Sequence, residues 1–301
     1  MSPKLKPLAE QVIVITGTSS GIGLATAQLA AQRGAKVVLS ARSSQTLDEV
    51  VSRIKSTGHE ALAVAADVAD RQQLQKVADA AIRQFGRIDT WVNNAGLSIY
   101  GRLDEVSDED NRRLFDINFW GVVNGSLVAL PYLKQNGGAL INVGSEASEA
   151  VVPLLGMYSA TKHAVKGFTD GLRIEIEQID KAPISITLIQ PTATNTPFPH
   201  HAKNYMDKEP ALPNPMLDPQ QVASAILSAA EKPQPTIKVG AMSKLNTFIS
   251  KAVPALGEKL AARQAPSFKS NEPPRNPDGA LYCPSKSAGD SGRVHGQPSR
   301  M

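Results

Sequence analysis

The chain has 301 residues, of which 42% are apolar, and this length suffices for one large domain or two small ones. Its formal net charge of +4 is mild, and its lysines and arginines are scattered. This pattern argues against a nucleic-acid-binding protein and leaves anionic small molecules as candidate partners.

The single cysteine, Cys283, excludes an internal disulfide and any paired-cysteine metal or redox motif. The apolar run VIVIT near the N-terminus is too short for a signal core or a membrane span. We therefore expect a cytoplasmic protein with no transmembrane segment.

Short β-branched runs alternate with helical patterns over the first 240 residues. The predicted strands cover 12–15, 36–40, 61–65, 90–92, 139–143 and 185–189, with a weaker run at 236–239. The predicted helices cover 22–33, 45–57, 71–84, 108–135, 157–178 and 219–231. The strand runs are apolar on both faces, as buried parallel strands are. The alternation predicts an α/β fold, a Rossmann-like doubly wound parallel sheet of about seven strands with helices on both faces.

The domain organisation follows from where this alternation stops. We predict one dinucleotide-binding and catalytic domain over residues 1–245 and a C-terminal extension over 246–301 that is largely irregular. Within the domain, the proline-rich stretch 191–219 is expected to form a long irregular loop of the kind that often acts as a lid. In the extension, the motif GALYCP at 279–284 offers Leu281 and Tyr282 as buried anchors.

The first strand runs into a glycine-rich turn, VIVITGTSSGIG, that opens a helix. Gly17, Gly21 and Gly23 permit a tight turn and let backbone N–H groups approach a pyrophosphate, to which the helix N-terminus adds its positive end. The alternative is a purely structural turn. The position in the first strand–helix unit favours phosphate binding.

The end of the second strand indicates which dinucleotide fits. A site for NAD requires an acidic residue there to hold the ribose 2′-hydroxyl, and this chain has Ala41 and Arg42 instead. An arginine suits the 2′-phosphate of NADP, although it also occurs as an ordinary solvated side chain. The sequence therefore favours NADP(H) over NAD(H).

In MYSATK, Tyr158 and Lys162 stand four positions apart and share one face of the predicted helix. The pair is either an ordinary surface contact or a phenol kept acidic by a positive neighbour. The rest of the chain decides between them.

Taken together, these motifs resemble the short-chain dehydrogenase/reductase family over about residues 10–240. TGTSSGIG is similar to its phosphate loop, AADV places Asp67 at its adenine-contacting acid, and NNAG at 93–96 matches its signature after the fourth strand. The tyrosine and lysine match its Y-x-x-x-K motif. One departure is that the family usually has Pro-Gly after the sixth strand, where this chain has Pro191-Thr192.

The resemblance implies a catalytic set of Asn118, Ser145, Tyr158 and Lys162. Tyr158 would exchange a proton with a carbonyl or alcohol, and Ser145 would hydrogen-bond the same oxygen. Lys162, together with an oxidised nicotinamide, would lower the pKa of the phenol and would reach the nicotinamide ribose. Asn118 is expected to bend its helix and hold a water. Ser148 remains an alternative to Ser145, and Asn118 is alternatively an ordinary helix residue.

The motifs and the resemblance together predict a set of cofactor-binding residues and no metal site. The set is Gly17, Thr18, Ser19, Ser20, Gly21, Ile22, Gly23, Arg42, Asp67, Val68, Asn94, Ala95, Gly96, Tyr158, Lys162, Pro191, Thr194 and Thr196. Thr196 is the threonine expected at the nicotinamide carboxamide. His200 and His201 lack ligand partners at metal-binding spacing and are expected to be loop residues within reach of substrate.

The substrate pocket is expected to be mostly apolar, which favours a hydrophobic carbonyl or alcohol. Its candidate residues are Leu97, Ser98, Ile99, Leu154, Leu155, Met157 and the loop 192–217. The predicted helices 108–135 and 157–178 are apolar beyond one stripe, so we expect a homodimer or homotetramer.

The leading hypothesis is an NADP(H)-dependent oxidoreductase that transfers a hydride between the nicotinamide and a carbonyl or secondary alcohol. Two alternatives remain. One is an NAD(H)-dependent alcohol dehydrogenase of the same family, and the other is a non-catalytic nucleotide-sensing protein on this fold.

Overall fold

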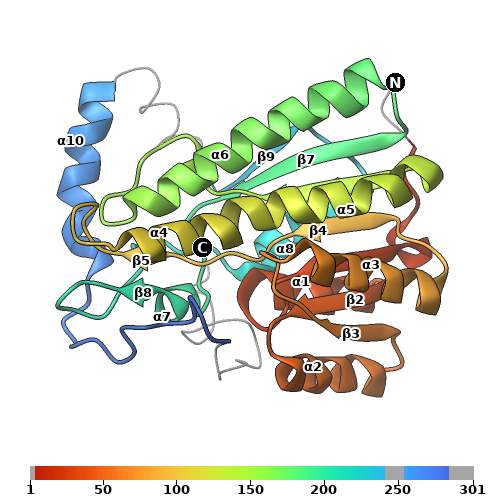
Figure 1. Cartoon of the computed structure of the whole chain (residues 1–301), viewed down its shortest axis with the longest axis horizontal. Coiled ribbons are helices and arrows are strands. Elements are labelled where there is room, and N and C mark those ends of the chain that lie inside the picture. Colours follow the sequence, from red (N-terminus) through yellow and green to blue (C-terminus); the bar gives the residue numbers. More distant parts are fainter. Residues whose placement is uncertain (1–3, 241–253, 285–301) are drawn as a thin grey trace.

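The centre of the protein is a parallel seven-stranded sheet with the strand order β3-β2-β1-β4-β6-β7-β9 (Figure 1). The computed structural model describes residues 4–240 and 254–284. The strands are β1 (Val12–Thr16), β2 (Lys36–Ala41), β3 (Ala61–Ala65), β4 (Thr90–Asn93), β6 (Gly138–Val143), β7 (Ile184–Pro191) and β9 (Thr236–Val239). The predicted Rossmann-like sheet is thereby confirmed, since the order reverses at β1 as in doubly wound folds.

Helices cover both faces of the sheet and enclose two separate apolar cores. One face carries α1 (Gly21–Gln32), α2 (Ser44–Ser56) and α8 (Pro219–Ala229). The other carries α3 (Arg71–Phe85), α4 (Asp108–Phe115), α5 (Gly121–Asn136) and α6 (Gly156–Arg173). Figure 1 shows α5 and α6 lying side by side over the sheet. Because both faces are covered, the central strands are apolar on both sides, as their sequences predict.

Local sequence signals set the helix boundaries. The Asp70 side chain accepts hydrogen bonds from the backbone of Gln72 and Gln73 at the start of α3, and Gly86 ends this helix at φ +77°. Asp218 and Gln221 form a reciprocal capping box at the start of α8. These caps provide hydrogen-bond partners for backbone groups at the helix ends that have none within the helix.

The predicted helix 108–135 is continuous but irregular. A π-helical turn, Asp116–Trp120, joins α4 to α5, and Asn118 lies within it. A second π turn, Ile174–Ile179, follows α6. Such turns frequently mark functional sites.

Two regions contain short elements that the sequence did not predict. The stretch 191–219 contains a short helix, α7 (Phe198–His201), and a strand, β8 (Lys203–Asn204), which pairs in parallel with β5 (Ile99–Tyr100). We expected an irregular loop, and two-residue strands leave no periodicity to detect. In the second described range, α10 (Pro254–Gln264) and a 3₁₀ turn, Ala265–Phe268, precede irregular chain up to residue 284.

The predicted boundary at 245 and 246 lies outside the described residues. Within the described part of the chain, every helix is too short or too polar to cross a lipid bilayer.

Candidate active site

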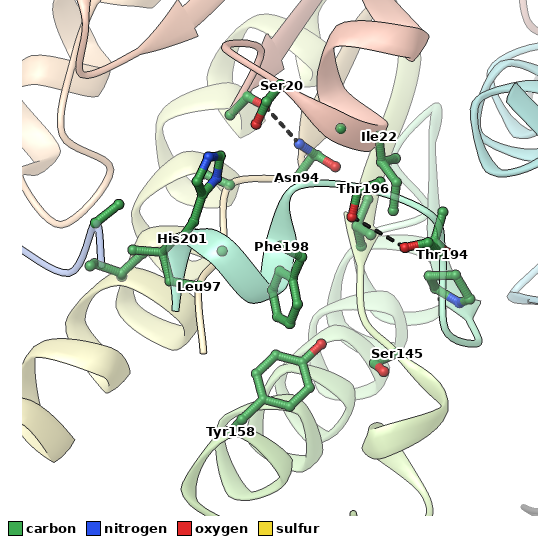
Figure 2. A pocket seen from close by; sticks show the side chains of 18 of the residues that line it. Ser20, Ile22, Asn94, Leu97, Ser145, Tyr158, Thr194, Thr196, Phe198 and His201 are labelled. Carbon is green, nitrogen blue, oxygen red and sulfur yellow. Dashed lines mark hydrogen bonds between the residues drawn. The ribbon is translucent and has the colours of Figure 1, made fainter. Parts of the chain in front are cut away.

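A cleft opens at the carboxyl ends of β1, β4, β6 and β7, where doubly wound sheets bind ligands. The residues that follow these strands line it, and α7 and residues from the 268–284 region close its far side. Figure 2 shows the side chains that converge on it. The sheet therefore brings together the phosphate turn at Gly17 and the segment around Thr196, which are far apart in the sequence.

The glycine-rich turn forms a cradle for an anion at one side of this cleft. Gly17 and Gly21 have φ values of +74° and +57°, a region that favours glycine. A Cβ on Gly23 would lie 2.2 Å from the Gly17 carbonyl oxygen, so the turn closes only with glycine there. The N-cap residue of α1, Ser20, makes no side-chain capping bond. The first-turn amides of α1 are therefore suited to a phosphate, and the cradle fits a dinucleotide pyrophosphate.

Asn94 connects β4 to this turn. Its Nδ2 donates to the carbonyl oxygens of Thr16 (2.9 Å) and Gly17 (3.2 Å). The Asn94 side chain thereby fixes the backbone path of the phosphate turn from behind.

Most of the predicted cofactor-binding residues line the cleft, and two do not. Those that line it are Gly17, Ser19, Ser20, Gly21, Ile22, Arg42, Asp67, Val68, Asn94, Ala95, Gly96, Tyr158, Lys162, Pro191, Thr194 and Thr196. Thr18 is instead fully buried and donates to the Ser40 carbonyl at 3.3 Å. At Gly23, the space that a Cβ would take is occupied by the Gly17 carbonyl group and the Asn94 side chain. Both residues shape the cradle without facing it.

Arg42 and Asp67 line one end of the cleft, and Arg113 contacts Asp67 there without lining the cleft itself. Arg42, at the end of β2, donates to the backbone carbonyls of Ala280 and Leu281. Arg113, on α4, makes an ion pair with Asp67 and also donates to the Leu281 carbonyl at 3.4 Å. Arg113 was not predicted, because its contact with Asp67 spans 46 residues and no motif marks it.

Tyr158 and Ser145 meet in the cleft from different elements. Tyr158 lies in the first turn of α6 and Ser145 follows β6, and Figure 2 shows the tyrosine hydroxyl directed toward the serine. Burial raises the pKa of Tyr158 to about 12, the hydrogen bond from Ser145 opposes this rise, and the charge of Glu146 adds to it.

The expected lowering of the Tyr158 pKa is therefore absent in the protein alone, and this is a correction. The physical reason is the burial of the phenol, which is the largest cause of its raised pKa. Lys162 Nζ lies over the tyrosine ring, 5.7 Å from its centroid, and donates to the Val143 carbonyl at 2.9 Å. Burial in turn lowers the pKa of Lys162 to about 8. The contribution expected from an oxidised nicotinamide remains a prediction.

Asn118 is fully buried and does not line the cleft. Its Oδ1 accepts from the Leu97 amide and its Nδ2 donates to the Leu97 carbonyl, each at 2.9 Å, with a further bond to Thr161 Oγ1 at 3.1 Å. The side chain thus joins the π turn, the segment after β4 and α6. Its place in the structure is that of a positioning residue.

Of the two serines in SEAS, only Ser145 faces the cleft. Ser148 is buried, and its Oγ accepts from the Ser145 amide at 3.2 Å. This reciprocal cap holds the turn in which Ser145 sits.

The space beside Tyr158 is lined mainly by apolar side chains. The Phe198 ring contacts the Tyr158 ring edge-on, with centroids 5.5 Å apart. The other apolar lining residues at this end include Leu97, Val152, Leu155, Leu212 and Pro213. Of the predicted pocket residues, Leu97 and Leu155 line the cleft, whereas Ser98, Ile99, Leu154 and Met157 do not.

The two adjacent histidines of α7 have different surroundings. His200 Nδ1 is hydrogen-bonded to Glu209 Oε1 at 3.1 Å. His201 lines the cleft, and burial lowers its pKa to about 4. In the described part of the chain, no cluster of three or more acidic, histidine or cysteine side chains is arranged for a metal ion.

The segment after β7 keeps a regular path despite Thr192. The Thr192 amide donates to the Val239 carbonyl at 3.2 Å, and Thr194 Oγ1 donates to the Thr192 carbonyl at 2.9 Å. Thr196 Oγ1 donates in turn to the Thr194 carbonyl at 3.3 Å. Glycine is therefore not required at position 192 for this segment to reach the cleft.

Comparison with known proteins agrees with this geometry. The sequence model of the short chain dehydrogenase family matches residues 11–206. The "Uncharacterized oxidoreductase YxnA" of Bacillus subtilis (strain 168) is 43% identical over 284 residues, covering 93% of this chain and 80% of the relative.

Two solved structures share the fold. A short chain dehydrogenase/reductase from Burkholderia phymatum in complex with NAD has a TM-score of 0.75 and 27% identity, covering 84% of this chain and 96% of that one. An alcohol dehydrogenase from Thermococcus sibiricus complexed with 5-hydroxy-NADP has a TM-score of 0.67 and 26% identity, covering 76% and 95%. The chain belongs to the short chain dehydrogenase family, the oxidoreductases that act on CH–OH and C=O groups.

Proposed function

We propose that the protein is an NADP(H)-dependent oxidoreductase that interconverts a carbonyl and a secondary alcohol, with Tyr158 as general acid and base. The observation that carries the proposal is the meeting of the Tyr158 hydroxyl and Ser145 at the end of a cleft that begins with a phosphate cradle. The related structures that hold NAD and 5-hydroxy-NADP support a nicotinamide cofactor in this cleft.

The preference for NADP(H) rests on the end of β2. Arg42 lines the cleft there, and neither an aspartate nor a glutamate occupies the strand end. Its guanidinium suits a 2′-phosphate, whereas a ribose 2′-hydroxyl calls for an acidic acceptor. An NAD(H)-dependent enzyme of the same family is the alternative.

A bound nicotinamide cofactor would supply or accept the hydride. The residues of the chain handle the proton and the oxygen. Tyr158 Oη donates its proton to the carbonyl oxygen in reduction and takes it back in oxidation. Ser145 Oγ hydrogen-bonds the same oxygen and stabilises the negative charge that develops on it.

At neutral pH, Tyr158 is in the form that donates a proton and Lys162 is mostly in its charged form. With a pKa of about 12, Tyr158 carries the proton that reduction needs. With a pKa of about 8, Lys162 is still mostly charged at pH 7 beneath the phenol ring. The Lys162 charge stabilises negative charge near Tyr158 once the proton has left.

The substrate is a small molecule with an apolar body. Phe198, Leu155 and Val152 surround the approach to Tyr158, and they offer dispersion contacts and few polar partners. A hydrophobic or amphipathic ketone or alcohol therefore fits this end of the cleft better than a sugar phosphate does.

The working form is a homodimer or homotetramer. Large apolar side chains are exposed in the π turns beside α5 and α6, at Trp120 (51%), Ile174 (57%) and Ile179 (70%). Such groups on a helix surface are typical of an interface with a second subunit.

The direct test is turnover of purified protein against a panel of carbonyl compounds with NADPH and with NADH. We expect consumption of NADPH with hydrophobic ketones or aldehydes and a clear preference over NADH. A protein that binds NADPH but reduces nothing in the panel would support the non-catalytic nucleotide-sensing alternative.

A further inference from the structure

The segment of residues 276–284, here called the strap, closes the adenosine end of the cleft. Leu281 is fully buried in the apolar core, and the Ala280 amide donates to the His201 carbonyl at 2.8 Å. A Cβ on Gly279, which has a φ of +57°, would lie 2.3 Å from the Ala202 carbonyl oxygen. The strap is therefore packed closely against the end of α7.

The strap fixes the direction of the Arg42 guanidinium. Its two terminal nitrogens donate to the Leu281 and Ala280 carbonyls. A guanidinium has five N–H groups, so three remain for another acceptor. Arg113 donates to the same Leu281 carbonyl and so holds the strap from a second side. Since Arg42 also lines the cleft, its remaining donors are held in place before any nucleotide binds.

The strap also contacts the backbone of His201. While the Ala280 amide binds its carbonyl, the imidazole lies at the cleft, and Figure 2 shows the ring directed toward the side formed by Ser20. Its Nε2 is buried and has no hydrogen-bond partner among the described residues. A buried polar atom of this kind calls for a partner, and a ligand in the cleft can supply one.

Arg42 and His201 act on each other electrostatically, since the charge of Arg42 contributes, after burial and His200, to the low pKa of His201. The ring is therefore neutral at pH 7 and offers a hydrogen bond rather than a second charge. A neutral partner beside a guanidinium is compatible with binding one phosphate group.

We propose that the strap positions Arg42 and His201 as neighbouring hydrogen-bond groups for the 2′-phosphorylated ribose of the cofactor, so that residues 276–284 help to set the preference for the phosphorylated nucleotide. This inference rests on the proposed NADP(H) dependence. Arg42 and His201 contact the nucleotide, and Gly279, Ala280 and Leu281 are positioning residues.

The test uses two ligands that differ only in the 2′-phosphate, adenosine 2′,5′-bisphosphate and adenosine 5′-monophosphate, with calorimetry as the readout. We expect wild-type protein to bind the bisphosphate at least about tenfold more tightly. In Gly279→Val, the new side chain pushes the strap off Ala202. The bisphosphate affinity should then fall about five- to tenfold, while the monophosphate affinity changes less than about twofold.

Asn276→Ala is the matched control, because it changes an exposed side chain of the same strap and should leave both affinities unchanged. The combination of Gly279→Val with Arg42→Lys should lose little more than Arg42→Lys alone, because both act through the same guanidinium. Independent losses would overturn the inference.

A measurement on the wild-type protein covers the case in which Gly279→Val does not fold. Hydrogen exchange at the Ala280 amide should slow more with the bisphosphate than with the monophosphate, because phosphate binding tightens the contact between Arg42 and the strap. Equal protection by both ligands would refute the inference.

The two proposals fail differently. If wild-type protein does not distinguish the two nucleotides, the proposed NADP(H) dependence is wrong. If wild-type protein distinguishes them but Gly279→Val weakens both equally, strengthens the bisphosphate or changes neither, the cofactor proposal stands and the role of the strap is wrong.

Discussion

At the scale of single residues, the site depends on two buried groups whose pKa values move in opposite directions. Burial raises the pKa of Tyr158 to about 12 and lowers that of Lys162 to about 8. In both cases the neutral form is favoured, because charge is costly to bury. At pH 7, Tyr158 is therefore neutral, whereas Lys162 is mostly charged and its burial lowers the stability of the folded protein.

That cost predicts the effect of Lys162→Met on stability. The folded pKa of Lys162, about 8, lies below its ordinary value of 10.5, so folding is penalised in full below pH 8 and the penalty disappears as the pH rises toward 10.5. The shift corresponds to about 3 kcal/mol. After subtraction of the lost hydrogen bond to Val143, we expect Lys162→Met to be about 1–2 kcal/mol more stable at pH 7.

Urea unfolding of both proteins at pH 7 and pH 10 measures this difference. The gain should shrink at pH 10, where the wild-type lysine is largely neutral. Lys55→Met, at an exposed position, should show neither the gain nor the pH dependence. A destabilised Lys162→Met at pH 7 would show that the ammonium is not under the penalty described here.

At the scale of elements, a polar network joins β4 to the neighbouring elements. Asn93 accepts from Trp91 Nε1 at 2.8 Å and donates to Asn142 Oδ1 at 2.9 Å and Ser126 Oγ at 3.1 Å. Asn142 continues the chain to Thr169 Oγ1 on α6 at 3.0 Å. The network thus ties the strand that precedes Asn94 to the helix that carries Tyr158.

Asn93→Ala should destabilise the protein by about 2–4 kcal/mol, because it leaves the Trp91 indole N–H and the Asn142 Oδ1 without their buried partner. The denaturant midpoint should fall with little change in the slope of the unfolding transition. Asn136→Ala, at an exposed position at the end of α5, is the control and should change stability by less than about 0.5 kcal/mol. Equal effects of the two substitutions would argue against a network.

The elements also show what the sequence could and could not predict. The seven strands and the long helices were predictable because buried runs and caps leave local signals. The strands β5 and β8 were not, since each has two residues and depends on a partner far along the chain. The place of Asn118 in a π turn agrees with the expected irregularity of its helix.

The site was predictable where a motif carries it and not where tertiary packing does. Tyr158, Ser145 and the phosphate turn stand in short motifs, and they converge at the strand ends. Arg113 has no local signal, because its contacts with Asp67 and Leu281 depend on tertiary packing, and the contact of the strap with Arg42 is likewise not marked by any motif. The predicted anchor in GALYCP was right for Leu281, which is fully buried, and wrong for Tyr282, which is 46% exposed and donates to Asp110.

At the scale of the whole molecule, the sheet gathers the cleft at its strand ends, and three of the exposed large apolar side chains lie on the π turns beside α5 and α6. Trp120 lies in the π turn between α4 and α5, and Ile174 and Ile179 lie in the π turn that follows α6. Their exposure is costly in an isolated chain and is relieved by association.

We therefore expect light scattering to give a mass of two or four chains, and a combined Trp120→Glu and Ile174→Glu variant to shift toward the monomer with an unchanged circular dichroism spectrum. Leu260→Glu on α10 is the control, because Leu260 lies on a different element, and it should leave the assembly intact. A monomeric wild-type protein would remove the basis for the proposed assembly.

The measurement that tests the central claim most directly is the rate of NADPH-dependent carbonyl reduction in wild-type and Tyr158→Phe proteins, together with the affinity of each for NADPH. The substitution removes one hydroxyl from a buried ring and leaves the phosphate cradle intact. The account predicts that kcat/KM falls about 10²–10⁴-fold while NADPH affinity changes less than about twofold. A Tyr158→Phe enzyme that reduces the carbonyl at the wild-type rate would contradict it.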